Sequence, residues 1–213
     1  MFLDELPEFR RHVIDALRQP LEDHAVTIAR AQITLSYPAR FTLVAAMNPC
    51  PCGYLSDSRR TCTCSPAQIR RYRARVSGPL LDRIDLHIEV PALAYDDLAE
   101  RVPGASSSQI RQRVIAARQR QLDRFAGEVF CNAQMITRHL RQHGQLDRDG
   151  QALLAKAMDR LGLSARAYDR ILKVARTIAD LAGADQIRSP HLAEAIQYRS
   201  LDRQLRDDAR FAT

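Results

Sequence analysis

Residues 2–6 read FLDEL, and the fold class that we predict from the sequence starts from this short stretch. Phe2 and Leu3 end an apolar run, and two consecutive carboxylates, Asp4 and Glu5, follow directly. In an open α/β sheet, ligands bind beyond the carboxyl ends of the parallel strands. The stretch therefore indicates a strand that ends at a ligand site, with an acidic loop after a strand as the alternative. Because a strand seldom begins a domain with its last residues, we expect more of the sheet to precede it.

A second apolar run has the same kind of ending. Residues 41–47, FTLVAAM, favour a buried strand, and Asn48 follows them. If the two strands are neighbours, Asn48 lies beside Asp4 and Glu5. One carboxylate can then hold Mg²⁺, and the other can polarise a water for attack on a phosphoryl group while the amide positions that water. Ordinary turn chemistry before a proline is the alternative for Asn48.

Patterns elsewhere predict an α/β segment followed by an all-α segment. The first contains a helix stopped at Pro20, a hairpin at residues 25–38, a helix capped by Ser65 and a third strand at 83–90. A Pro, Gly and Ser-rich linker is expected at 102–109. Only helical patterns follow, at residues 107–125, 150–161 and 164–183 and from Ser189 onward.

Cysteine spacing is the sharpest local feature of the chain. Four of the five cysteines form two C-x-C pairs, Cys50 with Cys52 and Cys62 with Cys64. Four thiolates so close in sequence suit a tetrahedral zinc ion with a structural role. Reduced cysteines without a metal are the alternative, and Cys131 is expected to be a small buried side chain.

The charge of the chain favours a polyanionic partner. There are 32 basic and 25 acidic residues, which gives a net charge of +7, and only Lys156 and Lys173 are lysines. Nucleic acid is the expected partner, with a basic chain that has no such partner as the alternative. Neither lysine follows a glycine, so the 213 residues contain no G-x-x-x-x-G-K-[ST] phosphate-binding loop. No apolar stretch is long enough for a membrane span, and we expect a cytoplasmic protein.

Three groups of basic residues remain open to two readings. Arg83 lies between Asp82 and Asp85, where a local salt bridge is the simple expectation. Arg166 shares a helix face with two further basic residues, which is typical of a solvated face but also of a phosphate contact. Five more arginines in residues 107–125 can contact a nucleic-acid backbone or nothing.

Five stretches together resemble the magnesium-chelatase-like AAA+ ATPases of the ComM/YifB type. They are FLDELPEF (2–9), VTIARA (26–31), YPARFTLVAAMNPCPCGY (37–54), SGPLLDRIDLHIEVP (77–91) and LSARAYDRILKVARTIADLAG (163–183). The resemblance implies that residues 1–101 are the second half of a P-loop NTPase core, truncated so that Walker A is absent. It further implies a linker and basic helix at 102–127 and a helical lid domain at 128–213.

The resemblance also implies roles for individual residues. Asp4 and Glu5 match Walker B, as the magnesium-associated acid and the residue that activates water. Asn48 matches sensor 1, Arg83 the arginine finger that acts on nucleotide held by a neighbouring subunit, and Arg166 sensor 2. The hairpin at 25–38 resembles an insert that projects toward the pore of a ring.

An ATP- and Mg²⁺-dependent motor that acts on DNA as a ring, with six subunits expected, is the function that the resemblance implies. Without a phosphate-binding loop, this chain alone is expected to be inactive. The alternatives are a magnesium chelatase subunit that inserts the metal into a porphyrin, a zinc-stabilised module that binds nucleic acid without catalysis, and an inactive remnant.

Overall fold

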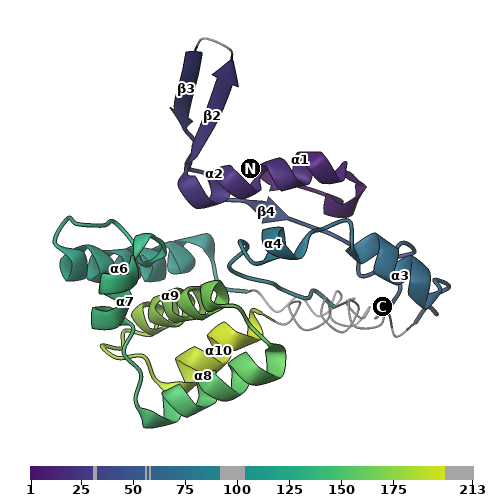
Figure 1. Cartoon of the computed structure of the whole chain (residues 1–213). Helices are drawn as coiled ribbons and strands as arrows, with labels where there is room; N and C mark the ends of the chain where they lie inside the picture. The colour runs from purple at the N-terminus through teal and green to yellow at the C-terminus, as the bar shows by residue number, and fades with distance from the viewer. Residues whose placement is uncertain (31–32, 56, 58, 92–103, 200–213) are drawn as a thin grey trace. The chain divides into compact units, whose positions relative to one another are not determined.

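The computed structural model describes residues 1–30, 33–55, 57, 59–91 and 104–199 of the chain. These residues form two compact units. The first unit contains Met1–Ile84, and the second contains Asp85–Ile88 and the helices that begin at Ser107 (Figure 1).

The first unit combines short helices with two small sheets. Its elements are β1 (Phe2–Leu3), η1 (Leu6–Glu8), α1 (Arg11–Ala16), α2 (Arg18–Asp23), β2 (Ala25–Arg30), β3 (Ile33–Pro38), β4 (Val44–Ala45), α3 (Pro66–Arg73) and α4 (Gly78–Leu81). The core that holds these elements consists of Leu6, Ile14, Val76, Leu80 and Leu81.

Strands β1 and β4 pair in parallel, so the two polar strand ends are neighbours, which was the condition for placing Asn48 beside the acid pair. The backbone N–H of Leu6 extends the pairing by donating to the carbonyl oxygen of Ala46 at 2.9 Å. The predicted buried strand at 41–47 is wrong in extent, because only Val44–Ala45 is strand and Val44 is 54% exposed. Among the described residues β1 is the only strand beside β4, so one side of β4 stays open.

The predicted helix that stops at Pro20 is instead two helices. The break comes at Leu17, between α1 and α2, and Pro20 lies buried in the first turn of α2. Proline has no backbone N–H to donate to the residue four positions earlier, and that position falls in the preceding helix. Pro20 therefore separates two helices rather than ending one.

The predicted hairpin is confirmed as β2 and β3, an antiparallel pair that extends away from α2 (Figure 1). Val26 pairs with Tyr37 and Ile28 with Leu35, so these apolar side chains share one face of the ribbon. All four are at least 38% exposed.

Helix α3 begins as predicted. The Ser65 hydroxyl accepts a hydrogen bond from the backbone N–H of Gln68, and the Gln68 side chain accepts one from the backbone N–H of Ser65. This reciprocal capping box, with Pro66 at the first helical position, sets the start of the helix directly after Cys64.

The predicted third strand at 83–90 is wrong, since these residues have no strand partner. The backbone N–H of His87 donates to the carbonyl oxygen of Tyr198 at 2.7 Å, and the His87 side chain is buried. Leu86, Ile88 and Val90 are exposed. The sequence alternates between apolar and polar residues as a strand does, but the polar His87 is buried and its apolar neighbours are exposed.

The second unit consists of helices, as expected. They are α6 (Ser107–Phe125), η2 (Asn132–Gln134), α7 (Thr137–His143), α8 (Arg148–Leu161), α9 (Ala165–Leu181) and α10 (Ser189–Gln197). Helix α9 packs against α6, α7 and α10. Its buried side chains in the shared core are Ile171, Leu172, Ala175 and Ala179.

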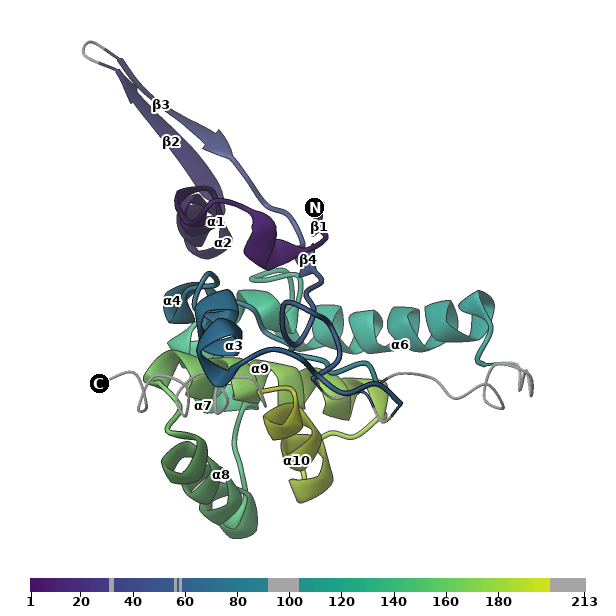
Figure 2. The ribbon, with the colours of Figure 1, turned by 90° about the vertical axis from the view of Figure 1, so that its right-hand side faces the viewer.

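The expected linker at 102–109 is partly wrong. The helix begins within it, at Ser107, because the Ser106 hydroxyl caps the backbone N–H of Gln109. Residues 102–103 lie outside the described residues. The first half of α6, residues 107–116, is exposed throughout, and Figure 2 shows it extending past α9.

A buried ionic network joins α6, η2 and α9. The Asp180 carboxylate accepts hydrogen bonds from Arg124 at 2.9 Å, from Asn132 at 2.8 Å and from Arg176 at 3.2 Å. For the arginine group that includes Arg124, a contact with nucleic acid or no contact was left open, and the guanidinium of Arg124 instead pairs with Asp180 inside the unit. Arg120, from the same cluster, lies 3.8 Å from a carboxylate oxygen of Asp185.

None of the helices in the described part of the chain is both long and apolar enough to cross a bilayer.

We predict that Asp180→Asn strongly destabilises the protein. The substitution leaves Arg124 and Arg176 without their buried anion, which costs about 3–5 kcal/mol in the free energy of unfolding. Urea denaturation at pH 7 measures this cost. Asp123→Asn is the matched control, because Asp123 lies on α6 and accepts only an exposed hydrogen bond from Gln119.

The pH dependence of that difference has a defined sign. Burial raises the pKa of Asp180, but the hydrogen bonds from Arg124 and Asn132 outweigh it and hold the pKa below its usual range. The stabilisation is therefore complete above the unfolded pKa of about 4 and is lost as the pH falls through the folded pKa. If the difference in the free energy of unfolding between wild type and Asp180→Asn increases as the pH falls, this assignment is contradicted.

Candidate functional site

The acid pair lies just beyond β1, on an unusual piece of backbone. Asp4 and Glu5 are both exposed, and a carboxylate oxygen of Asp4 accepts a hydrogen bond from the backbone N–H of Glu5 at 2.9 Å. Glu5 has a φ of 50°, in the left-handed region that residues other than glycine seldom adopt. Leu6 and Pro7 are buried directly after it. The buried turn thus holds two carboxylates toward solvent at the strand end.

Asn48 lies exposed after β4, at the same edge as the acid pair, because β1 and β4 run parallel and side by side. Its side chain lies against the turn that follows, in which the backbone N–H of Gly53 donates to the carbonyl oxygen of Cys50 at 3.0 Å. A Cβ on Gly53 would lie 4.0 Å from the amide carbon of Asn48, and the φ of Gly53 is +83°. The turn therefore passes close to the amide and favours glycine there.

Arg83 does not make the local salt bridge that was the simple expectation. Its guanidinium pairs with Glu22 on α2 and donates to the carbonyl oxygen of Pro79 at 2.7 Å. The side chain is 8% exposed, and its Nε has no hydrogen-bond partner among the described residues. Asp85 instead pairs with Arg170 of α9, within the second unit.

Arg166 lies exposed in the first turn of α9. The Ser164 hydroxyl caps this helix by accepting from the backbone N–H of Ala167 at 3.2 Å. The positive end of the helix dipole and the guanidinium together favour an anion at this point of the second unit.

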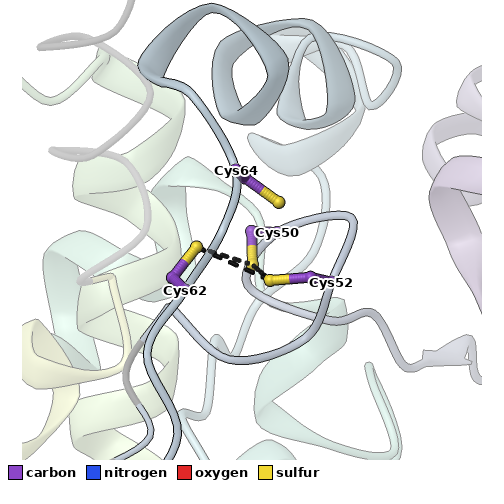
Figure 3. A group of neighbouring side chains, drawn as sticks. All are labelled: Cys50, Cys52, Cys62 and Cys64. Atoms are coloured by element: carbon purple, nitrogen blue, oxygen red, sulfur yellow. Dashed lines mark hydrogen bonds between the residues drawn. The ribbon is translucent and has the colours of Figure 1, made fainter.

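Four cysteine side chains converge in the first unit, as the spacing predicted (Figure 3). The Sγ atom of Cys50 lies 3.4 Å from that of Cys52 and 3.7 Å from that of Cys62. With Cys64 included, all four sulfurs lie within 4.8 Å of one another. Zinc bound tetrahedrally by four thiolates at about 2.3 Å separates the sulfurs by roughly 3.8 Å. The cluster could therefore hold a metal ion, and Cys131 is half-buried and outside it.

The thiols of this cluster differ in acidity. Hydrogen bonds from the backbones of Tyr54 and Thr63 lower the pKa of Cys52 to about 6. Burial raises the pKa of Cys64 to about 12. A dication would replace the remaining protons and bind all four sulfurs as thiolates.

Sequence reasoning missed the residues that support Asn48 from α3. Tyr72 is buried, and the Nε of the adjacent Arg73 donates to the carbonyl oxygen of Pro49 at 3.2 Å. Burial raises the pKa of Tyr72, and the charges of Glu8 and Glu5 raise it further. An aromatic residue inside an arginine-rich helix, RRYRAR at 70–75, was the available signal.

Two family models match adjacent parts of the chain. The model described as "Magnesium chelatase, subunit ChlI" matches residues 1–98. The model described as "Magnesium chelatase, subunit ChlI C-terminal" matches residues 104–199. The two matches together cover nearly all of the described residues.

Curated proteins from several bacteria are similar to the chain over most of its length. It is 50% identical over 207 residues to Competence protein ComM of Haemophilus influenzae, and 46% identical over 206 residues to Uncharacterized protein YifB of Escherichia coli. It is 40% identical over 200 residues to Uncharacterized protein Rv2897c of Mycobacterium tuberculosis. These alignments cover 93–96% of the chain but only 39–40% of each relative. The chain therefore belongs to the magnesium-chelatase-like family of ComM and YifB.

Proposed function

We propose that these residues form part of an ATP-hydrolysing AAA+ motor. The observation that carries this proposal is the placement of Asp4, Glu5 and Asn48 at one edge of a parallel strand pair. Membership of the magnesium-chelatase-like family supports it, because the matched model covers both strands.

The chemistry follows from the residue types. Asp4 associates with the Mg²⁺ that accompanies the nucleotide phosphates. Glu5 orients the attacking water and accepts its proton, and Asn48 holds that water without neutralising the carboxylates. Since phosphoryl transfer depends on positioning and charge stabilisation, exposed groups on a buried, rigid turn suit this task. Arg166 contributes charge at the phosphates.

A ring is the assembly in which Arg83 takes part. In the proposal its guanidinium leaves Glu22 and reaches the nucleotide bound by the neighbouring subunit, with six subunits as the expected number. The Nε of Arg83 is buried and has no partner among the described residues, which supports a side chain whose full set of contacts is not made within one chain.

DNA is the proposed substrate of the motor. Arg111, Arg113 and Arg118 lie on α6 and are exposed, and the net charge of +7 favours a polyanion. Insertion of magnesium into a porphyrin is the rival function within the family. The exposed arginines favour DNA over that rival.

The 213-residue chain is predicted to hydrolyse no ATP, since it contains no phosphate-binding loop. In a longer protein that joins these residues to such a loop, Glu5→Gln is expected to lower kcat roughly 100-fold or more and to leave nucleotide binding intact. Phosphate release and nucleotide titration measure the two effects. Asp23→Asn, an exposed acid on α2, is the control that leaves kcat unchanged. If the 213-residue chain hydrolyses ATP and Glu5→Gln abolishes that activity, the requirement for the phosphate-binding loop is contradicted.

DNA binding by the 213-residue chain is predicted to weaken steeply with salt. Fluorescence anisotropy with labelled duplex DNA gives the slope of log K against log salt concentration. Replacing Arg111 and Arg113 together with glutamine is expected to reduce that slope by about 2, one unit for each phosphate that is no longer neutralised. Arg148→Gln, on the exposed start of α8, is the control. If the slope is unchanged in the double variant, α6 does not contact the DNA.

Zinc is the metal that we propose for the four-cysteine cluster, in a structural role. Four sulfur ligands leave no open position for a catalytic water, and soft thiolates select zinc over magnesium. One zinc per chain is expected after purification under reducing conditions without added metal. A chelator is expected to lower the melting temperature by several degrees, and Cys131→Ala is expected to keep both properties. A metal-free protein with the same melting temperature contradicts the proposal.

A further inference from the structure

The segment that carries the four cysteines also carries most of the net positive charge of the chain. Residues 49–75 contain six arginines and one acid, Asp57, which gives +5 of the total net charge of +7. A zinc ion bound by four thiolates would bring two negative charges in total, so the segment stays basic with the metal in place. This segment is therefore the strongest candidate in the first unit for contact with a polyanion.

Two of the six arginines are used within the first unit. Arg73 donates to a backbone carbonyl oxygen at 3.2 Å, and Arg75 forms an ion pair with Glu8 at 2.9 Å. Arg59 and Arg60, which we call the loop pair, are both exposed. They lie in the cysteine loop, residues 53–61, of which the structure describes 53–55, 57 and 59–61. The cysteine loop thus presents two adjacent positive charges to solvent.

The backbone that carries the loop pair is held in place. The Sγ atoms of Cys52 and Cys62, which flank the cysteine loop, lie 3.6 Å apart (Figure 3). Between them, the Asp57 carboxylate accepts hydrogen bonds from the backbone N–H of Arg59 at 2.7 Å and from that of Arg60 at 3.0 Å. Because this backbone is already ordered, a ligand that binds the two side chains has less conformational entropy to overcome.

The guanidinium of Arg60 is also fixed. It lies over the Tyr54 ring, 5.1 Å from the ring centroid, and donates to the Tyr54 hydroxyl oxygen at 2.6 Å. A guanidinium has five N–H donors in a planar fork, so this bond leaves donors for other acceptors. The fork matches the geometry of phosphate oxygens, which can accept two parallel hydrogen bonds from it.

We propose that the cysteine loop is a second DNA-binding element of this chain, in which Arg59 and Arg60 bind phosphates of the DNA backbone. The choice of DNA rests on the proposed function. The loop pair lies in the first unit and α6 lies in the second, so either contact can exist without the other. Phosphate contacts orient a protein on DNA without reading its sequence, and the loop pair is expected to bind duplexes of different sequence alike.

Arginine modification by phenylglyoxal tests the contact on the wild-type 213-residue chain. Mass spectrometry of peptides gives the modification rate of each arginine at low salt, with and without duplex DNA at a saturating concentration. The DNA is expected to slow modification of the loop pair at least about fivefold, because bound phosphates cover the guanidinium groups. Arg10 and Arg11, an adjacent exposed pair at the start of α1, are the internal control and are expected to react at unchanged rates.

A double variant gives an independent measurement. Combining Arg59→Gln with Arg60→Gln is expected to reduce the slope of log K for DNA against log salt concentration by about 2. Combining Arg10→Gln with Arg11→Gln removes the same charge from the same unit and is expected to leave the slope unchanged. Melting temperatures equal to that of wild type are expected for both double variants, because the replaced side chains are exposed, and they report that the fold is retained.

The outcomes separate this inference from the proposed function. If DNA protects the loop pair no more than the control pair, or if the slope is unchanged in the loop variant, the loop contact is overturned. DNA remains the partner in that case if the variant of Arg111 and Arg113 lowers the slope. If only the loop variant lowers the slope, the loop contact stands and α6 is removed. Phosphate release tests the ATPase separately, because the loop pair is not placed at the nucleotide.

An acidic polypeptide is the other polyanion that the loop pair could bind. Polyglutamate, supplied at the same concentration of charge as the DNA, is expected to protect the loop pair less than DNA does. Equal or stronger protection by polyglutamate overturns DNA as the partner of the cysteine loop.

Discussion

Four cysteine sulfurs gather within 4.8 Å of one another and join the segment after β4 to the segment before α3. Thiols are weak hydrogen-bond donors and do not attract one another strongly. Here they bring Cys50, next to the end of β4, against Cys64, next to the start of α3. The small sheet contributes little stability of its own, because β1 and β4 share only two residue pairs. The zinc ion that we propose would supply the missing attraction between the end of β4 and the start of α3.

The second unit is held together in a different way. Its helices share an apolar core, and its polar residues at the centre are charges that satisfy one another around Asp180. The Asp180 side chain is fully buried, so the two arginines beside it belong to the fold rather than to a ligand site. The arginines on the exposed half of α6 and at the start of α9 face solvent instead. Arginines in this unit therefore either pair with buried Asp180 or face solvent, and only their burial in the structure distinguishes the two groups.

Local chemistry made much of the fold predictable. The Ser65 and Ser164 caps, the hairpin and the long helices all follow from short-range patterns, and the structure contains them. The sequence argument placed Asn48 beside the acid pair on the condition that the two strands are neighbours, and the parallel pairing of β1 and β4 meets that condition.

The predictions that failed depended on distant neighbours. The pattern at 83–90 has the alternation of a strand, but the backbone N–H of His87 donates to the carbonyl oxygen of Tyr198 rather than to a neighbouring strand. Arg124 was indistinguishable in sequence from its exposed neighbours on α6. The hydrogen bond from Arg73 to the carbonyl oxygen of Pro49 joins residues that no spacing rule connects.

Zinc-edge X-ray absorption of the purified 213-residue chain is the most direct test of the proposed four-cysteine zinc site. We predict one shell of four sulfur ligands at about 2.3 Å from zinc, with no oxygen or nitrogen ligand. That result would show that the four cysteines bind one zinc ion as a closed structural site. A shell that contains nitrogen or oxygen in place of sulfur, or protein that takes up no zinc, would contradict the proposed zinc site.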